Sequence, residues 1–111
     1  MIEDMIVSHL SAILDVPVST MHHASDPDSF VIVERVGGGR QNRIRSATVA
    51  IQSYAPTGYA AAQLHEAVIA AMDDIVANDG IGGVSLNAEY NFTDEREKMP
   101  RYQAVFDVVY Y

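Results

Sequence analysis

Two segments of the chain have apolar residues spaced three or four positions apart, which predicts two amphipathic helices. The first segment precedes Pro17, which disfavours helical geometry in the residue before it. The second follows Pro56 and Thr57 and ends at 78–80, where Asn, Asp and Gly occur in succession. The first stripe comprises Ile2, Met5, Ile6, His9, Leu10, Ile13 and Leu14, and the second comprises Leu64, Val68, Ala71, Met72 and Ile75.

Four further segments have the composition or the two-residue period of β-strands. Residues 30–36 and 47–54 are apolar on both sides and β-branched, which predicts an antiparallel pair joined by a loop longer than a tight two-residue turn. Residues 84–92 and 102–111 alternate between two faces. We therefore expect one α+β domain over residues 1–111, with a four-stranded, mainly antiparallel sheet and two helices packed on one face.

The predicted strands carry more apolar surface than two helices can cover. Val105, Val109 and Tyr111 lie on the second face of the last strand, and the first strand pair is apolar on both faces. A second subunit is the simplest cover for this surface. The alternative is that valine stands on a solvent face because it suits strands.

The charge of the chain limits its partners. The 111 residues include 15 acidic and 7 basic ones, giving a formal net charge of −8, which opposes tight general binding to nucleic acid. Cysteine is absent, so disulfides, thiolate metal sites and cysteine nucleophiles are excluded. The acidic N-terminal segment lacks the basic region of a signal peptide, and no apolar run is long enough to span a bilayer, so we expect no membrane association.

The positive charge gathers around three consecutive glycines. Arg35, Arg40, Arg43 and Arg45 lie within eleven positions, in the stretch "RVGGGRQNRIR". This is no phosphate loop, because that motif needs a lysine, then serine or threonine, then a helix. The glycines favour a hairpin tip where the chain bends freely. The arginines can meet the acidic surface of an identical neighbour, or can simply keep an edge strand soluble.

Residues capable of catalysis or metal binding form no known pattern. The adjacent His22 and His23 point to opposite sides of an extended segment, and His9 and His65 lie on or beside helix stripes. Asp73 and Asp74 point in different directions, and no serine lies in a nucleophile elbow. We expect no enzyme, no metal and no cofactor.

Several stretches together resemble the tail terminator proteins of long-tailed bacteriophages, a family related to head-tail joining and minor tail proteins. They are "VPV" after the first helix, "FVIVERVGGG", "AIQSYA", the alanine-rich helix, "LNAEYNFTD" and "RYQAVFDVVYY". The resemblance implies a ring, typically a hexamer, that caps the tail tube, stops polymerisation and joins the tail to the head. Its partners would be copies of itself, the tail tube protein and the head-tail connector, with DNA passing through the lumen without specific binding.

The resemblance also implies a location and a contact surface. The protein would stand at the head-tail junction of the virion tail, and in the host cytoplasm before assembly. Contacts to a neighbouring subunit or to the tail tube would come from the strand connection, at Gly37, Gly38, Gly39, Arg40, Arg43 and Arg45. Two alternatives remain: a small nucleic-acid-binding module that uses the basic 35–45 hairpin, and a small-molecule-binding or enzymatic α+β domain.

Overall fold

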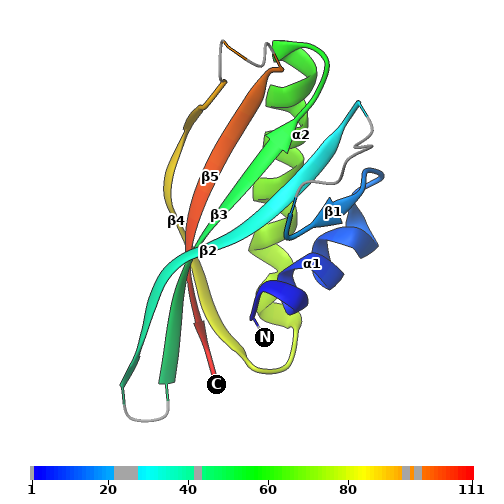
Figure 1. Ribbon diagram of the computed structural model, residues 1–111. Coiled ribbons are helices and arrows are strands. Elements are labelled where there is room, and N and C mark those ends of the chain that lie inside the picture. Colours follow the sequence, from blue (N-terminus) through cyan, green and yellow to red (C-terminus); the bar gives the residue numbers. More distant parts are fainter. Residues whose placement is uncertain (1, 22–27, 42–43, 94–95, 97–98) are drawn as a thin grey trace.

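A five-stranded mixed sheet forms the centre of the molecule (Figure 1). The computed structural model describes residues 2–21, 28–41, 44–93, 96 and 99–111. The strand order is β1-β2-β3-β5-β4; β1 runs parallel to β2, and every other neighbouring pair is antiparallel. The strands are β1 (Val18–Ser19), β2 (Phe30–Gln41), β3 (Ile44–Tyr54), β4 (Ile81–Asn91) and β5 (Arg101–Tyr110). The α+β class is confirmed, but the prediction of four strands missed β1.

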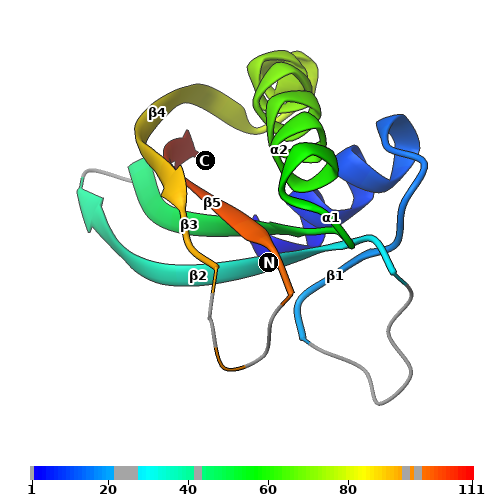
Figure 2. The ribbon, with the colours of Figure 1, turned by 90° about the horizontal axis from the view of Figure 1, so that it is seen from above.

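Two helices cover one face of this sheet, as predicted (Figure 2). They are α1 (Ile2–Ile13) and α2 (Gly58–Asp73), and α2 continues into a short 3-10 helix, η1 (Asp74–Ala77). Thr57 caps α2, because its hydroxyl accepts a hydrogen bond from the amide of Ala60 at 3.1 Å. No helix in the described ranges is long and apolar enough to cross a membrane.

The main core lies between the helices and the sheet. Both helical stripes contribute to it, and alternate residues of β2, β3 and β5 face them. Its fully buried members include Ile6, Leu10, Val33, Val49, Ile51, Val68, Met72, Ala104, Phe106 and Val108. His9 ties α1 to the end of α2: its Nε2 donates to the carbonyl of Ala71 at 2.7 Å, and its Nδ1 accepts from the amide of Asn78 at 3.0 Å. His9 is thus hydrogen-bonded through both ring nitrogens beside the core.

The opposite face of the sheet is partly sheltered by the chain itself. Phe30, Ile32 and Tyr54 form a second buried cluster, against which Met99 packs. At this end of the first strand pair the chain itself therefore buries the second face, where a second subunit was the simplest expected cover. Val109 and Tyr111, by contrast, are exposed.

Hydrogen bonds between side chains extend this sheltered face across three strands. The Gln52 amide donates to Gln103 at 2.8 Å, and the Gln103 amide donates to the hydroxyl of Tyr90. The Tyr54 hydroxyl donates to Gln52 at 3.0 Å and accepts from Arg101 at 2.9 Å. These pairs satisfy polar groups that would be costly to bury alone.

Strand β4 departs from the strict alternation that its sequence predicts. Leu86 pairs with Phe106, which faces the helices, but a register shift follows, and Ala88 pairs with Val105 on the other face. A bulge of this kind inserts one residue and reverses the sides of those that follow. Tyr90 therefore lies on the face away from the helices and Glu89 on the helix side, the reverse of what strict alternation from Leu86 predicts.

Candidate functional site

The most prominent feature is the outer half of the β2–β3 pair, which lies at one end of the sheet (Figure 1), where β3 remains paired with β5 as far as Arg45. We call this segment the arm and define it as residues 34–41 and 44–46. Its described residues are all exposed, and it belongs to a molecule measuring 44 by 25 by 24 Å. Strand pairing continues along it as far as Gln41 and Ile44.

This pairing corrects the expected loop. Gly37, Gly38, Gly39 and Arg40 lie in β2, and Arg45 lies in β3, so these site residues belong to a ladder instead of a freely bending connection. Arg43 lies outside the described residues. Glycine does not exclude strand pairing, and the β-branched residues of β3 supply the strand preference of the pair.

The backbone of the arm contains a bulge at Val36, where the pairing shifts between Arg35 and Gly37. Beyond it, Gly38 has a φ of +155°, and a Cβ there would lie 2.4 Å from the carbonyl oxygen of Ser46. That separation is too short for any real contact. Gly38 is therefore required for the close approach of the two strands, in a role different from that of a flexible tip.

The arginines of the arm share one side of the ladder. Val49 faces the helices, and Arg35, which is paired with it, shares that side. Ala47 also faces the helices, and Arg45 lies two residues before it in β3, so Arg45 is on the same side. Arg40 is paired directly with Arg45 and therefore joins it there. Like charges directly opposite each other destabilise a strand pair. Among the described residues, none bonds to the guanidinium of Arg40 or Arg45. Arg40 and Arg45 thus bond to no acidic partner among the residues that the structure describes, although the exposed Glu34 lies at the base of the arm.

Apolar side chains accompany this charge. Val36 and Ile44 are 55% and 44% exposed on the arm, and Val109 beside its base is also exposed. Val109 is paired with Ser46, so it adjoins the arm across the β3–β5 ladder. Because residues one position apart face opposite sides of a strand, Ile44 and Val109 lie on the face opposite to Arg40 and Arg45.

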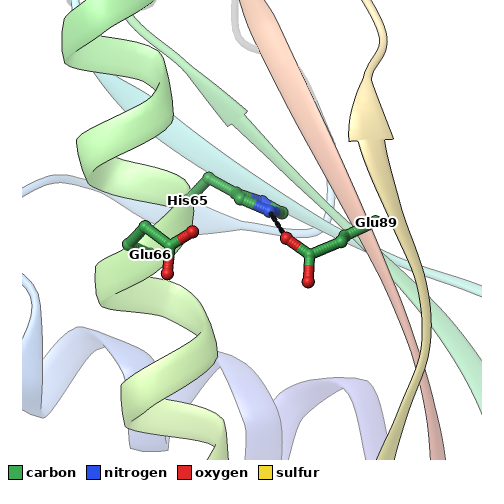
Figure 3. Close-up of side chains that lie close together, drawn as sticks. All are labelled: His65, Glu66 and Glu89. Carbon is green, nitrogen blue, oxygen red and sulfur yellow. Dashed lines mark hydrogen bonds and ion pairs between the residues drawn. The ribbon is translucent and has the colours of Figure 1, made fainter.

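A second cluster, which the sequence did not predict, lies between α2 and β4 (Figure 3). It consists of His65 and Glu66 on α2 and Glu89 on β4, whose ligand-type atoms lie within 4.8 Å of one another. We call it the seam. The bulge in β4 creates it, since Glu89 is paired with the buried Ala104 and so faces the helix. His65 is buried, and its Nε2 lies 2.9 Å from Oε1 of Glu89.

The seam has the ligand types for a metal ion but lacks the support that a metal-binding imidazole normally has. Such a histidine almost always donates its second ring N–H to a carbonyl or carboxylate. Nδ1 of His65 is buried without a hydrogen-bond partner among the described residues. One oxygen of Glu89 is hydrogen-bonded to Nε2 of His65, which leaves three carboxylate oxygens of the seam for another donor.

Comparisons with known proteins add no assignment. No model of a protein family matches this chain, and no curated protein sequence matches it. The inference of function therefore depends on the geometry of the arm and the seam, together with the sequence resemblance described above.

Proposed function

We propose that this chain is a structural subunit of a phage tail terminator, which assembles into a ring that caps the tail tube and joins it to the head. In this role it is a building block and not an enzyme, and its partners are further copies of itself, the tube protein and the head-tail connector. It would act at the head-tail junction of the virion, after synthesis in the host cytoplasm.

The arm is the observation that carries this proposal. The strand pair of the arm loses stability from its directly opposed Arg40 and Arg45, and a carboxylate supplied by a neighbouring copy would offset this loss. The remainder of the molecule is strongly acidic: none of the 15 acidic residues lies between Arg35 and Arg45, where four of the 7 basic residues lie. A positive arm on a negative body favours head-to-tail contact between identical copies, which closes into a ring when the rotation permits.

The net charge also suits a pore through which DNA slides. A net charge of −8 repels phosphate, so a ring of such subunits would not hold the DNA that passes through it. The cations of the arm would then be used between subunits or against the tube, away from the lumen. This placement reconciles a local basic cluster with an acidic protein.

Removing the charge of the arm tests this role. We expect Arg40→Ser, Arg43→Ser and Arg45→Ser, combined in one chain, to weaken ring formation and tube capping, measured by light scattering and by tail length. The matched control is Gln41→Ser, which changes the same arm without changing its charge. Normal assembly and normal tail length in the triple variant would reject a role for these arginines.

A nucleic-acid-binding module is the second candidate, because the guanidinium groups of Arg40 and Arg45, which bond to no other described residue, could bind phosphate. In that case the protein would be retained on DNA at physiological ionic strength, and retention would fall steeply with added salt. The terminator proposal predicts no such retention.

A further inference from the structure

We propose that the arm of one copy binds the seam of the next, with the guanidinium groups of Arg40 and Arg45 contacting the carboxylates of Glu66 and Glu89. This inference rests on the proposed assembly and specifies the surface that receives the arm. It joins two features of the described residues: the guanidinium groups of Arg40 and Arg45, which bond to no described acidic residue, and two carboxylates that converge from different elements.

The carboxylates of the seam are available to a partner. The Glu89 side chain is 46% exposed, and only one of its oxygens accepts from His65. Glu66 is exposed on the adjacent turn of α2. Figure 3 shows that the His65 ring and the Glu89 side chain point toward each other, with the Glu66 carboxylate beside the ring. A cation that enters here meets both carboxylates at once.

A guanidinium group suits this arrangement better than a metal ion. Its five donors form a planar fork that can bind two carboxylates, and it needs no support from the second nitrogen of the imidazole. Separations of up to 4.8 Å between the seam atoms suit such a fork.

The arm cannot reach the seam of its own chain. Glu89 is paired with Ala104, and Ala104 with Ile51, which lies six residues along β3 from Arg45. At about 3.3 Å per residue this is roughly 20 Å along the sheet. Figure 1 shows the arm projecting from the opposite end of β3, away from α2. The contact must therefore form between copies, by two different surfaces.

Charge reversal tests the pairing. The arm variant is Arg40→Glu with Arg45→Glu, and the seam variant is Glu66→Arg. The seam variant keeps Glu89, so the His65–Glu89 pair is preserved. We expect each variant alone to self-associate about tenfold or more weakly than the natural chain in sedimentation equilibrium. A mixture of the two, and a chain carrying all three changes, should recover association.

The outcomes separate this inference from the proposed function. If the arm variant fails to associate while the seam variant associates normally, the arm binds another surface, so this inference is wrong and the assembly role stands. If the arm variant also associates normally, the assembly role of the arm fails too. Unfolding curves show whether each variant is folded. A variant that does not fold is replaced by the neutral changes Arg45→Gln or Glu66→Gln, with weaker association again expected.

Crosslinking gives a second and more local measurement, because the chain contains no cysteine. Gln41→Cys places a thiol on the arm, and Ala70→Cys places one on α2, one turn beyond Glu66. We expect an equimolar mixture of these variants to form a disulfide-linked dimer on mild oxidation. The control is Ser8→Cys, which is exposed on α1. Equal crosslinking of Gln41→Cys to Ser8→Cys and to Ala70→Cys would overturn the pairing.

Discussion

Replacing Gly38 with alanine tests whether the glycine run is a structural requirement of the arm. The added Cβ would lie 2.4 Å from the carbonyl oxygen of Ser46 and 2.6 Å from a terminal nitrogen of Arg35. The exposed Arg35 side chain can move away, but the Ser46 oxygen belongs to the paired strand. The two strands must therefore separate locally or change their pairing.

The expected cost combines this clash with an unfavourable backbone conformation. For a residue other than glycine, a φ of +155° costs about 1 to 3 kcal/mol of strain. This strain raises the equilibrium constant for local opening of the arm by a factor of roughly 5 to 150. Gly39→Ala is the matched control, because its Cβ would lie 3.8 Å from Oγ of Ser46, an ordinary contact. The control should be neutral, or more stable by about 0.4 to 1 kcal/mol, since alanine restricts the unfolded chain.

Amide hydrogen exchange followed by NMR measures the effect where it should occur. The arm lies outside the core, so we expect faster exchange at the arm amides of the Gly38→Ala variant and little change in the urea midpoint of the whole chain. The Gly39→Ala variant should exchange like the natural protein. Equal exchange in the two variants would refute a special role for Gly38.

Two further substitutions test contacts within the body of the protein. Gln103→Leu leaves the side-chain amide of Gln52 and the hydroxyl of Tyr90 without their partner. We expect the free energy of unfolding, measured with urea, to fall by about 1 to 3 kcal/mol. An unchanged urea midpoint would contradict the hydrogen-bonded network. Thr57→Ala removes the cap on the Ala60 amide and should lower the free energy of unfolding, measured by thermal unfolding, by about 0.5 to 2 kcal/mol. Thr57→Ser keeps the hydroxyl and should retain most of the stability. Equal losses in the two variants would argue against the cap.

The helices and most strands follow from local patterns in the sequence. A spacing of three or four residues places Ile6 and Leu10 on one face of α1, and Pro56 with Thr57 marks the start of α2. The two-residue strand β1 gives no such signal, because two residues cannot establish a period. It forms by pairing with β2, where Val18 is opposite Val31.

The errors have a common cause in backbone irregularities. The glycine run predicted a loop because local preference favours one, yet pairing with β3 continues through it. In β4, apolar and polar residues alternate both before and after the bulge. The inserted residue, however, moves every later residue of the strand to the opposite face of the sheet. No sequence pattern marks that bulge, so the approach of Glu89 to His65 could not be predicted.

The central claim is that this protein stops the growth of a phage tail tube, and one measurement tests it directly. Tail-tube subunits are polymerised with their length-determining partner, with and without this protein, and tube lengths are measured by electron microscopy. Our account predicts that the protein arrests elongation at a uniform length, and that the Arg40→Ser, Arg43→Ser, Arg45→Ser variant does so less well. Tubes that grow to the same lengths with and without the natural protein would contradict it.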